Sequence, residues 1–366
     1  MKRYSESCIL GTGPAARICS LYLKNTSHLV VGNGPVMGSL GKYKMRDREL
    51  NYIPIFPVYQ SPLYNDLWPE DNEKHDFLEY IDCGDITKEY DKIQHLVSEA
   101  TPNSYSAKYL SRGESINTQK NILLAYKLLG DVIFEKRLRR LSDKVSRHYG
   151  NNLPNARIGF VNGFSAYYDK LRTIPGEDLL EDIIEIDVEN KKVVTTQSEI
   201  HYQRLISTLN LRDIMRKVKR APDIQLISRP ASFYVFKIEP NLIPHKVIYD
   251  LELESPLYRV FSVESDVIIV QLSFLYSMAD EDPQPIIDRL KQIFGPQFTV
   301  DYQFKYKIKD AYPIDCSSDT DLNQFKTDLE ANDIMLIGRF AEWEYLDLHE
   351  LNYYRVNENH IYKQNA

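Results

Sequence analysis

The segment Cys8-Ile9-Leu10-Gly11-Thr12-Gly13-Pro14-Ala15-Ala16 has the Gly-x-Gly-x-x-Ala spacing of a turn that binds a dinucleotide. The first glycine would make the tight turn, the second would let the backbone approach a pyrophosphate, and the alanine would let a helix pack closely on a strand. The N-terminus of that helix would face the phosphates, because its N–H groups and its dipole favour negative charge. The expected cofactor-binding residues here are Gly11, Gly13, Pro14, Ala15 and Ala16; a purely structural turn is the alternative.

An acidic residue that would complete such a site is missing. In the usual fingerprint it ends the second strand, about 20 residues further on, and binds the ribose hydroxyls. This chain has Gly32-Asn33-Gly34 there. Asn33 can hydrogen-bond a ribose without a charge, so the identity of the nucleotide stays open. The stretch from Gly38 and Ser39 to Gly41 suits a second loop close to the cofactor, or an ordinary surface turn.

A second segment whose residues could take part in cofactor binding lies near the other end of the sequence. Residues Ile334 to Ile337 form a buried-type strand, which ends in Gly338-Arg339. A glycine and then an arginine at a strand end suit an approach to a cofactor from the carboxyl edge of a sheet. We therefore expect both residues to belong to the cofactor site.

The elements that position these residues follow from hydrophobic patterning. A strand, a tight turn, a helix to about Lys24 and a strand at His28–Val31 give the order that a dinucleotide fingerprint requires. Further elements are predicted downstream: helices at 120–129 and 132–145, a hairpin at 183–188 and 193–196, a strand at 204–208, antiparallel strands within 232–275, and an amphipathic helix that closes near Gly295. The predicted class is α/β, with an antiparallel sheet on the substrate side.

Composition and the absence of certain motifs argue against several classes of function. The net charge of −7 argues against general capture of nucleic acid. Four cysteines without a CxxC pair argue against a disulfide framework or zinc finger, and favour a cytoplasmic location. No apolar run approaches the roughly 20 residues of a membrane span. The sequence also has no HExxH, GxSxG or P-loop motif, so metal and serine-hydrolase chemistry are not expected.

The chain resembles the flavoprotein UDP-galactopyranose mutase and, more loosely, its amine-oxidase-like relatives. The most specific likeness is the run Gly-Arg-x-Ala-Glu-aromatic-x-Tyr-x-Asp over residues 338–347. Ala311-Tyr312-Pro313-Ile314 is similar to that family's Tyr-Tyr-Pro-Val. The segments 130–136 and 159–164 resemble the start of its central helix and a glycine-rich turn.

The resemblance implies FAD as the cofactor and a three-part architecture. Its parts would be a discontinuous FAD-binding domain of residues 1–65, 156–210 and 305–366, a helical insert at 66–155, and an antiparallel-sheet substrate domain at 211–304. In that family reduced FAD attacks the anomeric carbon of a sugar, displaces the nucleotide diphosphate and lets the ring reclose without net redox change.

Residue roles are implied by position. Arg339 would lie by the flavin and the substrate diphosphate, Tyr345 and Tyr312 would offer hydroxyls to the diphosphate, and Asp347 would lie beside the flavin. Leu348 would join Gly338 among the cofactor-binding residues. The alternative is a buried Arg–Asp pair with core tyrosines.

Departures from the family leave three functions open. Pro54 and Pro57 replace the family's two histidines, and Ser146 replaces the tryptophan that would stack on uracil. Proline can neither donate a hydrogen bond nor titrate. The leading hypothesis is an FAD-dependent enzyme that acts on an activated sugar, such as a nucleotide-sugar, or a similar small anionic metabolite. The alternatives are a flavin-dependent oxidoreductase of amine-oxidase type and a non-catalytic binding protein. A homodimer is an option that the sequence leaves open.

Overall fold

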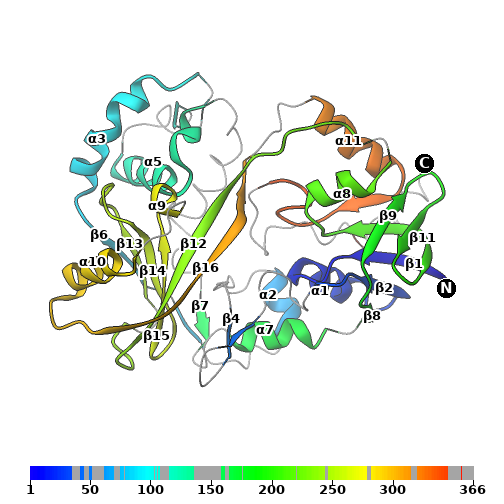
Figure 1. Ribbon diagram of the computed structural model, residues 1–366, viewed down its shortest axis with the longest axis horizontal. Coiled ribbons are helices and arrows are strands. Elements are labelled where there is room, and N and C mark those ends of the chain that lie inside the picture. Colours follow the sequence, from blue (N-terminus) through cyan, green and yellow to red (C-terminus); the bar gives the residue numbers. More distant parts are fainter. Residues whose placement is uncertain are drawn as a thin grey trace. The chain divides into compact units, whose positions relative to one another are not determined.

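The computed structural model divides the chain into two compact units (Figure 1). The first holds Met1–Ile53, Ser165–Leu226 and Cys316–Ala366, and the second holds Pro54–Phe164 and Ile227–Asp315. Each unit is thus assembled from segments that are separated in the sequence. The structure describes residues 1–34, 42–44, 49–51, 62–69, 75–77, 79–102, 104, 106–107, 115–135, 158–160, 165–174, 176–219, 221–243, 246–277, 282–314, 320–344 and 356.

The borders of these units differ from the expected domain borders. Helix α8 (Leu211–Lys217) belongs to the first unit, although residue 211 was expected to open the substrate domain. Residues 305–313 form the second half of strand β16 (Val300–Pro313), which belongs to the second unit. The described part of the expected helical insert shares that unit with the antiparallel sheet. The three-part division itself stays a prediction.

The first unit is built on a mostly parallel sheet. Strand β1 (Lys2–Leu10) pairs in parallel with β2 (His28–Val31) and with β11 (Glu199–Ser207). Helix α1 (Pro14–Tyr22) connects β1 to β2, which makes the βαβ crossover that a parallel pair requires. The sheet is completed by β8 (Glu177–Leu179) and β17 (Ile334–Leu336), both parallel, and by the hairpin of β9 (Ile183–Asp187) and β10 (Lys192–Thr195), antiparallel. The predicted hairpin is confirmed.

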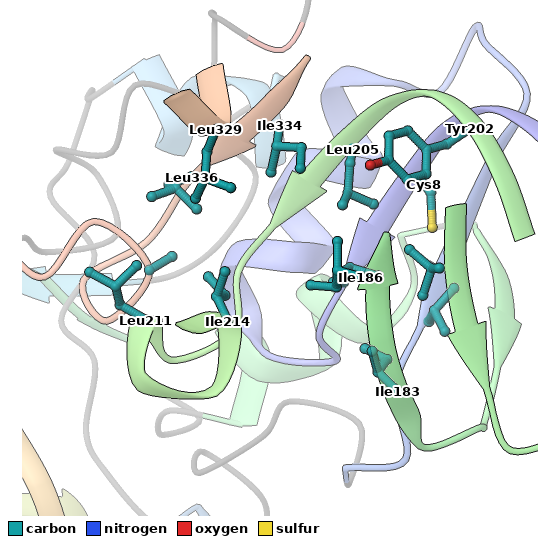
Figure 2. Close-up of a cluster of buried hydrophobic side chains, with 14 of the residues drawn as sticks. Cys8, Ile183, Ile186, Tyr202, Leu205, Leu211, Ile214, Leu329, Ile334 and Leu336 are labelled. Atoms are coloured by element: carbon teal, nitrogen blue, oxygen red, sulfur yellow. The ribbon is translucent and has the colours of Figure 1, made fainter. Parts of the chain in front are cut away.

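Helices cover both faces of this sheet, because alternate side chains of each strand point to opposite faces. On one face Leu211 and Ile214 of α8 and Leu329 of α11 (Thr320–Ala331) belong to the same buried cluster as Cys8 and Leu205 of the sheet (Figure 2). On the other face α1 packs along β1 and β2 and next to α7 (Ser165–Arg172). For this reason consecutive residues are buried at the ends of β1 (Cys8 to Leu10) and β2 (Leu29 to Val31), and Cys8 is a core thiol whose pKa burial raises to about 12.

The second unit is built on a six-stranded sheet. Its order is β16, β12 (Ser228–Ile238), β15 (Val267–Leu272), β14 (Leu257–Glu264), β13 (Lys246–Asp250) and β6 (Glu79–Cys83). All pairs are antiparallel except β6 with β13, which is parallel. Helix α10 (Gln284–Phe294) packs Ile286 and Leu290 on one face of the sheet and ends at Gly295. The predicted antiparallel sheet and amphipathic helix are confirmed.

Helices α3 (Ile86–Ser98) and α5 (Ile116–Leu129) pack against each other in the same unit. The side chain of Asp85 caps α3 and that of Ser115 caps α5, since each accepts backbone N–H bonds of its helix. Gly130, with φ +73°, ends α5 and opens a short 3-10 helix to Phe134 where a longer helix was expected; residues 136–157 lie outside the described part.

The remaining elements are short. They are α2 (Pro62–Leu67), α9 (Phe274–Ser277), the pair β3 (Lys42–Lys44) and β4 (Glu49–Asn51), and the pair β5 (His75–Phe77) and β7 (Ile158–Phe160).

Candidate functional site

The turn after β1 is tightly enclosed at Gly11. This residue has φ +113°, and its N–H donates to the Val31 carbonyl at 2.9 Å. A Cβ built on it would lie 2.3 Å from Thr208 Oγ1, and that hydroxyl donates to the Leu10 carbonyl at 2.8 Å. Both the left-handed backbone and the close hydroxyl exclude a side chain, so Gly11 makes the turn as the motif predicts.

Gly13 has the opposite surroundings. It is the N-cap of α1 in an extended conformation, with φ −74° and ψ 178°, and Pro14 follows in the first turn. A Cβ built on Gly13 would meet nothing within 4 Å in the described part of the chain. Among the described residues no side chain caps the helix, and its first turn holds no acidic residue. An uncapped helix start of this kind, with room beside Gly13, is the local arrangement that anion-binding helix N-termini have.

The C-terminal motif lies against the same helix. A Cβ on Gly338, which follows β17 with φ +126°, would come 3.6 Å from the Ala15 Cβ. The Gly338 N–H donates to Glu342 Oε1 at 3.0 Å, and the Glu342 N–H donates back to the Gly338 carbonyl at 2.8 Å. This doubly bonded loop carries Arg339, which is half-buried. The two motifs, from opposite ends of the sequence, thus meet at the start of α1.

Buried Arg17 is one cation near this helix start that is already paired. Its Nη2 lies 2.8 Å from Asp178 Oδ2 on β8, and the Arg17 side chain is only 3% exposed. The carboxylate neutralises the guanidinium inside the protein. We therefore infer that Arg17 holds α1 against the sheet and does not bind a ligand.

The end of β2 carries the residues that flank the expected ribose position. The Gly32 N–H donates to the Leu179 carbonyl at 3.1 Å, so β2 and β8 end at the same edge. Asn33 is exposed, and its Nδ2 donates to Asp182 Oδ2 at 3.2 Å. Thr12 fills the space beneath the two glycines, 3.2 Å from a Cβ built on Gly32 and 2.9 Å from one on Gly34.

Tyr312 lies in β16, in the other unit, and is 5% exposed. Its hydroxyl accepts a hydrogen bond from Gln271 Nε2 at 2.6 Å, and Gln271 Oε1 accepts one from Arg259 Nε at 2.8 Å. Tyr312 is therefore part of a polar chain across the antiparallel sheet. The remaining expected site residues, Gly38, Ser39, Tyr345, Asp347 and Leu348, lie outside the described residues.

Three contributors to this site were not expected from the sequence: Thr208, Glu342 and Asp182. Thr208 ends a predicted strand, and Glu342 stands within the C-terminal motif, so both stood in segments already singled out. Asp182 had no such signal, because it follows a three-residue strand that the pattern did not reveal.

Among the residues that the structure describes, no cluster of His, Cys, Asp and Glu could hold a metal ion. Within the same residues, no helix has the length and apolarity to cross a membrane.

Comparisons with known proteins find structural relatives only. No family model matches the chain, and no curated protein does. The structure of reduced UDP-galactopyranose mutase matches with a TM-score of 0.66 and 16% identity, over 96% of this chain and 97% of the other. Cyclohexylamine oxidase from Brevibacterium oxydans IH-35A matches with 0.68 and 13%, over 99% and 100%. A conjugated-linoleic-acid-producing fatty acid isomerase from P. acnes matches with 0.63 and 13%, over 98% and 99%.

These identities establish the fold alone. The chain has the mixed α/β fold of FAD-binding, amine-oxidase-like proteins, with a parallel Rossmann-like sheet and a mostly antiparallel second sheet. The mutase, amine oxidase and protoporphyrinogen oxidase structures that it matches share this fold with it at low sequence identity. The predicted fold class is confirmed.

Proposed function

We propose that the chain is an FAD-dependent enzyme whose cofactor diphosphate binds at the N-terminus of α1. The observation that carries this proposal is the meeting of the Gly11–Gly13 turn and the Gly338–Arg339 loop at Ala15. The diphosphate of a dinucleotide needs a backbone that it can approach closely on one side and a segment of the protein that encloses it on the other. The open space at Gly13 and the loop at Gly338 supply these two features.

The residues fit the cofactor in both charge and shape. The backbone N–H groups of the first turn of α1, which no side chain in the described part of the chain caps, would bind the diphosphate, and the turn holds no acidic side chain to repel it. Gly11 fixes the turn, and Glu342 fixes the position of Gly338. When bound, FAD supplies a reducible ring system that can serve as a nucleophile or as an electron carrier.

Arg339 is the residue we propose for charge stabilisation in the reaction. The Arg339 guanidinium is half-buried, and its loop is held by the two hydrogen bonds between Gly338 and Glu342. A guanidinium in such a position can hold an anionic group of the substrate and exclude water from it. The roles of Tyr345, Asp347 and Tyr312 toward the substrate, and of Gly38, Ser39 and Leu348 toward the cofactor, stay predictions. The substrate we propose is an activated sugar or a similar small anionic metabolite, and the reaction is a mutase-like rearrangement without net redox change.

An oxidoreductase of amine-oxidase type is the second candidate. Cyclohexylamine oxidase matches the chain as well as the mutase does, with TM-scores of 0.68 and 0.66. Pro54 also stands where the mutase family has a histidine. In this alternative the same diphosphate site holds FAD, and the substrate is oxidised.

The visible absorbance spectrum of the purified protein, before and after titration with FAD, tests the cofactor. We expect flavin bands that remain after gel filtration. A chain that neither carries nor takes up FAD would contradict both candidates.

Substrate turnover then separates the reactions. A sugar-isomer product formed by the dithionite-reduced protein, without use of an electron acceptor, supports the mutase. Consumption of dioxygen or another acceptor with turnover supports the oxidoreductase. A reducible bound flavin that supports neither reaction favours the non-catalytic binding protein.

A further inference from the structure

An acidic residue, Asp182, follows the strand next to β2, close to the place where the fingerprint's acid is missing. In the usual fingerprint the carboxylate ends the second strand, but here β2 ends at Val31 and Gly32-Asn33 follows it. Strand β8 runs parallel to β2 with Leu179 opposite Val31, and the Gly32 N–H donates to the Leu179 carbonyl. The chain that leaves β8 therefore passes the same carboxyl edge, next to the position where the acid is expected.

Asp182 lies on that segment and is held beside Asn33. Its Oδ2 accepts the Asn33 Nδ2 bond at 3.2 Å, and its backbone carbonyl accepts the Thr196 N–H at 2.9 Å. The backbone of Asp182 is thus held by Thr196, and its carboxylate is oriented by Asn33. The Asp182 side chain is exposed, and within the described ranges no Lys, Arg or His forms an ion pair with it.

The surroundings of Asp182 suit an adenosine. Leu180 and Ile184, two residues before and after it, are 61% and 56% exposed, whereas the intervening Glu181 and Ile183 are buried. Exposed large apolar side chains beside an exposed carboxylate offer an apolar surface for a base and an acceptor for ribose hydroxyls.

We propose that Asp182, oriented by Asn33, binds the ribose hydroxyls of the adenosine half of FAD. This inference rests on the proposed function and deepens it. A carboxylate accepts hydrogen bonds from two vicinal hydroxyls and repels a 2′-phosphate. The site would therefore select adenine nucleotides with a free 2′-hydroxyl. Asn33 suits this arrangement because an acid at position 33 would place two carboxylates side by side.

The test compares FAD binding by the wild type, Asp182→Asn and the double variant Asn33→Asp/Asp182→Asn, followed by flavin fluorescence. Loss of a charged acceptor should weaken FAD binding about tenfold to a hundredfold. The double variant returns the carboxylate to the usual strand-end position and should regain most of the affinity. Asp213→Asn, which removes an exposed carboxylate of α8 in the same unit, should bind as the wild type does.

Competition with ADP and 2′-deoxy-ADP provides a second readout. The wild type should prefer ADP, and Asp182→Asn should lose most of that preference. If wild-type protein binds no FAD, the proposed function and this inference both fail. If it binds FAD and Asp182→Asn keeps both the affinity and the preference for ADP, the inference alone is overturned.

Discussion

Single residues at the α1 turn show how one motif can hold two kinds of glycine. Gly11 is required by the fold, since its φ is positive and a Cβ would strike Thr208 Oγ1. Gly13 has ordinary dihedral angles and free space around it, so the fold does not require a glycine there. The described residues thus give no structural reason for a glycine at this position, which is consistent with the phosphate position proposed above.

Gly13→Ser should therefore abolish FAD binding while the protein stays folded. Serine is a favourable N-cap, and its hydroxyl would accept an N–H bond of the first turn, so we expect the free energy of unfolding without FAD to change by less than about 1 kcal/mol. The hydroxyl would occupy the proposed phosphate position. Thermal unfolding and FAD titration of the variant measure the two effects, with Gly13→Ala as the control for the added Cβ alone. Retained FAD affinity in Gly13→Ser would contradict the proposed phosphate position.

Lys127 is a residue-scale feature of the second unit. Its side chain is 2% exposed, and its Nζ donates to the carbonyls of Asp250 at 2.7 Å and Glu252 at 2.6 Å. Burial lowers the pKa of this amine from 10.5 to about 8. The carboxylate of Asp250 is bonded to Arg289 at 2.8 and 2.9 Å, so this lysine and arginine together fix the chain after β13.

The stability conferred by Lys127 should rise with pH. Below pH 8 the lysine is charged in both states, so the folded protein carries the whole cost of burying the charge. Between pH 8 and 10.5 only the unfolded state keeps the proton, so the free energy of unfolding rises, by up to about 3 kcal/mol. The difference in unfolding free energy between wild type and Lys127→Met, measured in urea across this range, isolates the effect. The buried thiols Cys8 and Cys19 have raised pKa values and act in the opposite direction, but they are present in both proteins. A flat or falling difference would show that Lys127 keeps its proton.

At the scale of elements, the first unit depends on how α1 is attached to its sheet. The attachment is apolar packing along β1 and β2, together with the ion pair from Arg17 to Asp178 on β8. The pair is asymmetric, because the arginine side chain is 3% exposed and the aspartate side chain 35%.

This asymmetry predicts unequal effects of removing either partner. Asp178→Asn leaves a buried guanidinium without a counter-charge, so we expect a loss of about 3 kcal/mol in unfolding free energy. Arg17→Met leaves a carboxylate that water can reach and fills the space with an apolar side chain, so the loss should be about 1 kcal/mol. Chemical denaturation of both variants at neutral pH measures the difference. Equal losses, or a larger loss for Arg17→Met, would contradict the assignment.

At the scale of the whole molecule, the fold persists at very low sequence identity. Structures 11–16% identical to this chain match over nearly its whole length with TM-scores of 0.63 to 0.68. A buried parallel sheet needs apolar strands and tight crossovers, which many sequences satisfy. Substrate identity needs particular side chains, so the fold leaves it open.

Binding of FAD should be visible in the stability of the whole protein. A ligand that binds only the folded state, at 100 times its dissociation constant, raises the free energy of unfolding by about 2.7 kcal/mol. We expect added FAD to raise the melting temperature of the wild type and to leave that of Gly13→Ser unchanged. Calorimetry with and without FAD measures both. An equal rise in the two proteins would place the cofactor elsewhere.

The sequence by itself predicted the local elements and named both the glycine turn and the Gly338–Arg339 segment as parts of the candidate site. The glycine turn, its flanking strands, the 183–196 hairpin and the helix that ends at Gly295 were predictable, because backbone conformation and hydrophobic period are local properties. Tertiary structure alone decided the rest. The approach of Gly338 to Ala15, the hydroxyl of Thr208 over Gly11 and the carboxylate of Asp182 beside Asn33 join residues far apart in sequence. Such contacts depend on the order of strands in the sheet, which no local pattern encodes.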